Sequence, residues 1–180
     1  MIADTEQPVD LEIGGMQVVG KIDRIERNAA TGGWRVLDYK TRDTGDTPEE
    51  NHSAVSRSAA DAPEFARFTI EGKERVWTDL QLPLYVEALA RRGRTPVVPA
   101  YFNLPKATGA TAVLAWEDYG EEWRAAASRC AEGVVAAVRA GVFWPPAEIP
   151  PREDGDYAEL FQQGTAASVD PEFARREGTG

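Results

Sequence analysis

Two β-patterned segments joined by a short polar connection constrain the fold of this chain more than any other feature. Apolar and polar residues alternate in "MQVVGKIDRIER", residues 16–27, and "WRVLDYK", residues 34–40, is rich in aromatic and apolar side chains. The connection "NAATGG" contains Asn and Gly, which tight hairpin connections favour. "VDLEI", residues 9–13, precedes Gly14 and Gly15 and predicts a further strand. The sequence therefore predicts an antiparallel three-stranded meander.

Charged side chains interrupt the last strand of this meander. Asp38 and Lys40 are two residues apart, so they lie on one face of the strand, whereas Leu37 and Tyr39 lie on the other. Asp23 lies in the preceding strand and can face Asp38 across the ladder. Two nearby carboxylates repel each other unless a proton or cation separates them, and a hard divalent cation, Mg²⁺ above all, suits such a pair. The pattern predicts a metal site at which Lys40 orients the attacking water in phosphodiester hydrolysis.

The middle and end of the chain predict alternating helices and strands. Helical spacing in "WTDLQLPLYVEALARRG", residues 77–93, precedes the buried-strand pattern "TPVVPAYFNL", residues 95–104, so a strand-helix-strand crossover is expected. "TAVLAW", residues 111–116, adds a strand. We expect a second helix that Asp118 caps and that Gly141 ends, with Trp123, Ala127, Cys130, Val134 and Val138 at helical spacing.

Two segments lack a sustained period. Residues 42–73 are rich in Asp, Glu, Ser, Gly and Ala, which predicts a long insertion loop where His52 is solvated and not a metal ligand. "VFWPPAEIPPREDGD" breaks regular structure, so we expect one domain over residues 1–144 and an irregular C-terminal tail over residues 145–180. The aromatic residues of "VFWPP" could stack on bases, but packing of the last helix against the tail explains them as well, and we favour that interpretation.

Charge and cysteine usage narrow the class of protein. The chain has 20 Lys and Arg against 30 Asp and Glu, and its net charge of −10 argues against a free-standing DNA binder. The basic run "ARRGR" suits a helix C-terminus. Cys130 is the only cysteine, which excludes an internal disulfide or a cysteine-built zinc or iron–sulfur site within this chain. With no long apolar run and no signal-peptide pattern, we expect no membrane span and a cytoplasmic location.

Three motifs in order give a resemblance to a known family. "GKIDRIE", "VLDYKT" and "QLPLY" resemble the RecB-like branch of the PD-(D/E)xK nuclease superfamily, which includes nuclease domains attached to recombination helicases. The resemblance covers residues 18–104. It implies an α/β, restriction-endonuclease-like core, in which helices flank a mixed central sheet. An antiparallel hairpin or meander and the strand-helix-strand crossover together form that sheet. It also implies hydrolysis of DNA in repair or recombination, beside a helicase, with Mg²⁺ or, as an alternative, Mn²⁺.

Six residues match positions that have a role in the resembling family. The implied metal ligands are Asp23, Asp38 and the backbone carbonyl of Tyr39, the catalytic lysine is Lys40, and the helix residues that border the site and contact substrate are Gln81 and Tyr85. Asp23 and Asp38 count among the catalytic residues as well. The iron–sulfur cluster of several related domains cannot form, because it needs four cysteines.

The sequence also departs from the resembling family. Family members commonly place a His or Glu ligand in a helix upstream of the first strand, but only 22 residues precede Asp23. We therefore expect that the chain is a C-terminal piece of a longer protein. Glu12 could replace that ligand if its strand runs beside Asp23, although a solvated edge position is favoured.

Two alternatives to a nuclease stay open at this point. The first is a catalytically incomplete nuclease-fold scaffold, or a DNA-contacting module, within a helicase complex. The second is an unrelated α/β binding domain, which would be favoured if Asp23 and Asp38 were distant in space.

Overall fold

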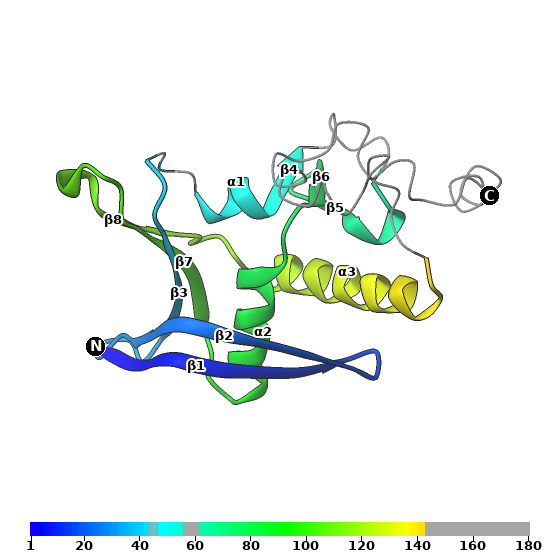
Figure 1. Cartoon of the computed structure of the whole chain (residues 1–180), viewed down its shortest axis with the longest axis horizontal. Helices are drawn as coiled ribbons and strands as arrows, with labels where there is room; N and C mark the ends of the chain where they lie inside the picture. Colours follow the sequence, from blue (N-terminus) through cyan, green and yellow to red (C-terminus); the bar gives the residue numbers. More distant parts are fainter. Residues whose placement is uncertain (44, 46, 56–61, 143–180) are drawn as a thin grey trace, which may run out of the picture. The chain divides into compact units, whose positions relative to one another are not determined.

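The computed structural model describes residues 1–43, 45, 47–55 and 62–142. The chain divides into two compact units, Met1–Ala136 and Ala137–Gly180. The described part of the second unit is the end of one helix, so the architecture below is that of the first unit (Figure 1). Within the described residues, no helix is long and apolar enough to cross a bilayer.

A five-stranded mixed sheet with the order β1-β2-β3-β7-β8 forms the centre of the unit (Figure 1). Pairing is antiparallel except between β3 and β7, which are parallel. Gly14 and Gly15 form the turn between β1 and β2 with φ of 53° and 73°, a conformation that glycine adopts without strain. The strands are β1 (Ile2–Ile13), β2 (Met16–Arg27), β3 (Trp34–Lys40), β7 (Val97–Asn103) and β8 (Ala112–Ala115). The predicted meander is confirmed.

Helix α2 (Gln81–Arg91) links the two parallel strands β3 and β7. Its buried face, which includes Leu82 and Leu89, joins the same apolar core as Ile25 and Val36 of the sheet. Burial of such side chains stabilises a fold by about 1.5–3 kcal/mol each. The predicted strand-helix-strand crossover is therefore confirmed.

The basic run after α2 is bound to β1. Arg91 donates to the Glu12 carbonyl, and Arg92 donates to the Pro8 carbonyl. Arg94 pairs with Asp4, with Nη1 and Oδ2 2.6 Å apart. These contacts agree with a structural role for the run and leave it poorly placed to bind phosphates.

The segment expected as a long loop contains a second, three-stranded sheet of the order β4-β6-β5. A capping box between Thr47 and Glu50 starts α1, and Phe68 stacks on Trp77 at 4.7 Å between ring centroids. The expectation of a loop is wrong for these residues. The sequence did not indicate them because helices and strands of three to five residues are too short to give a sustained hydrophobic period. The elements are α1 (Pro48–His52), β4 (Ser53–Val55), the 3₁₀ turn η2 (Glu64–Ala66), β5 (Arg67–Ile70) and β6 (Lys73–Trp77).

The first turn of helix α3 (Glu121–Arg139) packs on this second sheet through Trp123. The Trp123 ring lies edge-on to Trp77 and Trp116, with centroids 5.7 and 4.8 Å apart. Two nitrogens of Arg124 contact Glu87 of α2, with Nη2 and Oε2 3.1 Å apart. Aromatic packing and this ion pair therefore connect α3 to the second sheet and to α2.

The predicted limits of this helix are partly right. Cys130 is buried, and Gly141 has a φ of 71°, as expected of a residue that ends a helix. The helix begins at Glu121 and not directly after Asp118, and Val134 and Val138 are exposed. The predicted domain end at residue 144, the tail over residues 145–180 and the "FWPP" stretch lie outside the described residues.

Gly133 allows α3 to approach the 3₁₀ turn η2. A Cβ atom added at this position would overlap with the Cβ of Phe65. We expect Gly133→Ala to lower the free energy of unfolding, because overpacking costs about 1–3 kcal/mol and a helical Gly→Ala change stabilises by about 1 kcal/mol at most. Urea denaturation measures the difference. In a Phe65→Gly background, which removes the Cβ atom that is in the way, the same change should be neutral or stabilising. A stabilised single variant would contradict the packing.

Candidate active site

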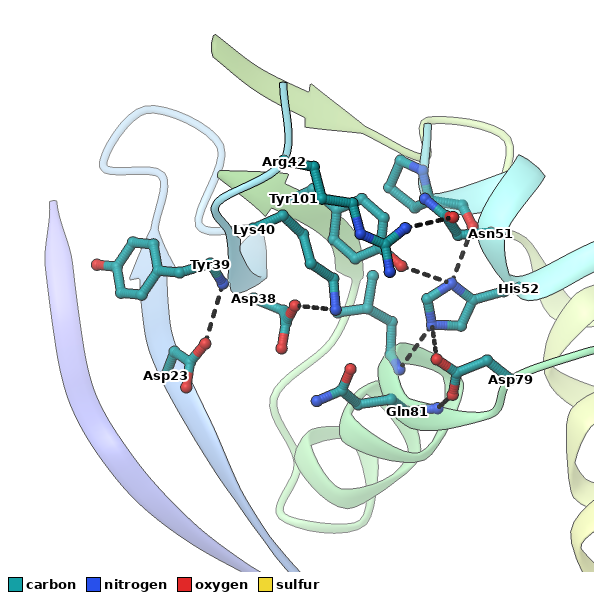
Figure 2. Close-up of polar contacts among 12 residues, drawn as sticks. Asp23, Asp38, Tyr39, Lys40, Arg42, Asn51, His52, Asp79, Gln81 and Tyr101 are labelled. Atoms are coloured by element: carbon teal, nitrogen blue, oxygen red, sulfur yellow. Dashed lines mark hydrogen bonds and ion pairs between the residues drawn. The ribbon is translucent and has the colours of Figure 1, made fainter. Parts of the chain in front are cut away.

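The hairpin register brings the two predicted metal-binding aspartates to adjacent positions. The last paired residues of β2 and β3 are Arg24 and Leu37, so Asp23 and Asp38 are one step further along the ladder. Asp23 Oδ2 accepts a hydrogen bond of 2.9 Å from the backbone N–H of Tyr39 (Figure 2). The two aspartates are thus neighbours, and the interpretation as an unrelated domain, which required them to be distant, is not supported.

Asp38 and Lys40 form an ion pair on the core side of β3. Asp38 is only 5% exposed, and its Oδ2 lies 2.7 Å from Lys40 Nζ. Lys40 Nζ also lies 4.9 Å from the centre of the Tyr101 ring. The Tyr39 ring points the other way and packs edge-on against Phe102 (Figure 2). The alternation predicted from the sequence is confirmed.

Gln81 and Tyr85 lie at the start of α2, one turn apart. The Gln81 side-chain amide donates to the Tyr85 hydroxyl at 3.3 Å, and that hydroxyl donates to the Lys21 carbonyl at 2.7 Å. Tyr85 is buried, and Lys21 lies two residues before Asp23. Tyr85 therefore ties α2 to β2 beside the aspartates and holds the amide of Gln81.

His52 was expected in solvent, and this expectation is wrong. The ring is fully buried at the end of α1, where its Nδ1 lies 2.9 Å from the Pro48 carbonyl and 3.0 Å from the Tyr101 hydroxyl. Its Nε2 accepts a hydrogen bond of 3.2 Å from the backbone N–H of Leu82. The capping-box pattern of Thr47 and Glu50 is the sequence signal that could have placed His52 on a helix.

Burial lowers the pKa of His52, although the nearby Asp79 carboxylate raises it in part. Between this lowered pKa and the ordinary value of 6.5, the unfolded chain binds a proton that the folded chain does not, so stability falls as the pH decreases below 6.5. We expect this loss in urea unfolding measured between pH 7 and pH 5. The chain has no other histidine, so His52→Phe should remove most of the slope in that range. An unchanged slope would contradict the assignment.

The register also decides which glutamate of β1 lies near the aspartates. Glu12 pairs with Gln17, six residues from Asp23 along β2, or roughly 20 Å at the rise of a strand. Glu12 therefore does not replace the upstream ligand. The residue opposite Asp23 is Glu6, which forms an ion pair with Lys21. On the other face of β2, Arg24 forms an ion pair with Glu26.

Comparison with protein families identifies the fold. The family model of the PD-(D/E)XK nuclease superfamily matches residues 2–154. The chain belongs to this superfamily. Comparisons with curated proteins and with solved structures gave no match. The mixed five-stranded sheet of this PD-(D/E)XK chain agrees with the predicted restriction-endonuclease-like core. Superfamily members are generally nucleases, and they typically use divalent metal ions.

The residues of this PD-(D/E)XK chain fit a divalent cation with few protein ligands. In the described ranges, no three His, Cys, Asp or Glu residues come together as a metal cluster. Asp23 and Asp38 nevertheless provide two carboxylates, and the buried Asp38 Oδ2 accepts no well-directed hydrogen bond from a described residue, although Lys40 lies beside it. Mg²⁺ usually keeps several waters and binds one or two carboxylates plus phosphate oxygens. Two aspartates with the Tyr39 carbonyl can meet that requirement.

Proposed function

We propose that this chain is a magnesium-dependent deoxyribonuclease domain of the RecB-like type that acts in DNA repair or recombination. The observation that supports this most is the pair of adjacent carboxylates, Asp23 and Asp38, with Lys40 2.7 Å from the buried one. The order of the three motifs along the chain agrees with it. We further propose that the domain works in the cytoplasm as part of a larger helicase–nuclease protein or complex.

Each side chain has a distinct task in this proposal. Asp23, Asp38 and the Tyr39 carbonyl would hold the Mg²⁺, which supplies Lewis-acid stabilisation of the phosphate charge when bound. The Lys40 ammonium would orient the attacking water and stabilise the negative charge that develops on the phosphate oxygens. Gln81 would position the DNA strand, and Tyr85, whose hydroxyl accepts from Gln81, would border the site and hold that amide in place.

A catalytically incomplete scaffold is the second candidate. The lack of a third acidic ligand among the described residues favours it. The burial of Asp38 argues against it, because a buried carboxylate costs stability and a scaffold has no need for one beside a second acid. We therefore place the nuclease first.

The charge of the chain suggests why a partner is needed. A net charge of −10 repels DNA at long range, and the basic run after α2 is bound to β1. A helicase with a basic channel would bring the strand to the site.

Cleavage of end-labelled single- and double-stranded DNA tests the proposal. We expect products with Mg²⁺ or Mn²⁺ and none with a chelator. A lack of products from this chain, and from a chain extended at its N-terminus, would contradict the nuclease and favour the scaffold.

A further inference from the structure

His52 joins three elements that surround the candidate active site. Its ring is fully buried, and its hydrogen-bond partners come from α1, from β7 and from the start of α2 (Figure 2). The Tyr101 side chain lies between His52 and Lys40: its hydroxyl contacts the imidazole and its ring contacts the ammonium. A single side chain, that of Tyr101, therefore separates His52 from the proposed catalytic lysine.

The hydrogen-bond partners fix the tautomer of the ring. The Leu82 N–H can only donate, so Nε2 must be the unprotonated nitrogen that accepts. The proton then lies on Nδ1, which donates to the Pro48 carbonyl and lies near the Tyr101 hydroxyl. The neutral ring thus uses one nitrogen toward α1 and the other toward α2.

The first turn of α2 depends on side chains from outside the helix. The first N–H groups of a helix have no partner within it. Here the Gln81 N–H donates to Asp79 Oδ1 at 2.7 Å, the Leu82 N–H donates to His52, and Pro83 has no N–H. His52 and Asp79 together therefore fix the direction in which the helix begins.

We propose that His52 is a positioning residue that orients the start of α2 through its Nε2 and so places Gln81 beside Asp38 and Lys40. The inference rests on the proposed nuclease function for its effect on activity. The geometry that supports it is independent of that function. The fully buried His52 ring accepts a hydrogen bond from the backbone N–H of Leu82, the residue next to Gln81. Asn51, the preceding residue, accepts from Arg42, so the same end of α1 also binds the segment after Lys40.

Three replacements separate this role from simple filling of the core. His52→Gln can keep an acceptor near the Nε2 position, His52→Asn can keep only a donor near Nδ1, and His52→Phe keeps the ring without either polar atom. We expect the kcat of His52→Gln to stay within a few-fold of the wild-type value. The kcat of His52→Asn and of His52→Phe should fall about 10- to 100-fold, which is the usual cost of misplacing an active-site group by about 1 Å. Thermal unfolding of each variant identifies any that fail to fold.

A second measurement does not need nuclease activity. Amide hydrogen exchange at Leu82 should be slow in the wild-type protein and in His52→Gln, and faster in His52→Asn and His52→Phe. A chain that shows this exchange pattern but never cleaves DNA would defeat the proposed function and leave the positioning of α2 intact.

Two results would overturn the positioning role. One is a His52→Phe protein with wild-type kcat and slow exchange at Leu82, as expected of a ring that only fills space. The other is an equal loss of kcat in all three variants, because the acceptor would then make no difference.

Discussion

Replacing Asp38 with asparagine is expected to lower the rate of DNA cleavage by about a thousandfold or more, because a proposed metal ligand is lost. The Lewis-acid stabilisation of a transition state by a metal ion is worth several kcal/mol, and about 1.4 kcal/mol corresponds to a factor of ten in rate. Asparagine has nearly the volume of aspartate, so the buried position is filled in the variant. The measurement is the initial rate on end-labelled DNA at saturating Mg²⁺, with the wild-type protein alongside.

A matched change tests whether any lost carboxylate has the same effect. Asp10 is an exposed aspartate of β1 that pairs with Val19, far along the hairpin from Asp38. Asp10→Asn should leave the cleavage rate unchanged. Wild-type activity in Asp38→Asn, with a folded protein shown by thermal unfolding, would defeat the assignment of the site.

Lys40→Met is expected to lower kcat by about 100- to 1000-fold, the usual cost of removing one group that stabilises charge in a transition state. Methionine keeps an apolar stem against the Tyr101 ring but removes the charge that lies 2.7 Å from Asp38. Since the lysine is proposed to act on the developing charge, KM for DNA should change much less than kcat. Steady-state kinetics on a labelled oligonucleotide separate the two parameters.

The control for this change is a lysine outside the site. Lys106 has a side chain that is 92% exposed and pairs with Asp43. Lys106→Met removes the same charge from the chain and should leave kcat unaltered. A rise in KM with unchanged kcat in Lys40→Met would assign Lys40 to substrate binding and contradict its catalytic role.

The sequence predicts the parts of the fold whose elements are long enough to show a period. The meander and the crossover are visible because β2, β3 and α2 have seven or more residues each. The neighbourhood of Asp23 and Asp38 follows from the same pattern, since strand alternation and hairpin register are local properties.

The second sheet and His52 could not be predicted in the same way. Strands β4 and β5 have three and four residues, and their stability comes from tertiary contacts such as the stacking of Phe68 on Trp77. The burial of His52 depends on Tyr101 and Leu82, which are distant from it in the sequence. Residues 42–73 are polar and show no sustained period, so pattern analysis does not indicate that they contain a buried residue beside the candidate site.

Helix α3 shows a different limit of pattern analysis. Its apolar residues do not form a single stripe along one face, because alanines occur all around the helix, at buried and at exposed positions. Helical spacing thus grouped the buried Cys130 with Val134 and Val138, which are exposed. Only packing against Trp77 and Trp116 determines which face is covered.

The most direct test of the proposed metal-dependent nuclease site is a crystal structure of the protein with Mn²⁺, measured at a wavelength where manganese scatters anomalously. We expect an anomalous peak between the carboxylates of Asp23 and Asp38, within about 2.0–2.3 Å of their oxygens. The Asp38→Asn protein should lack that peak under the same conditions. A protein that cleaves DNA with Mn²⁺ but binds the ion away from these two aspartates would contradict the proposed site.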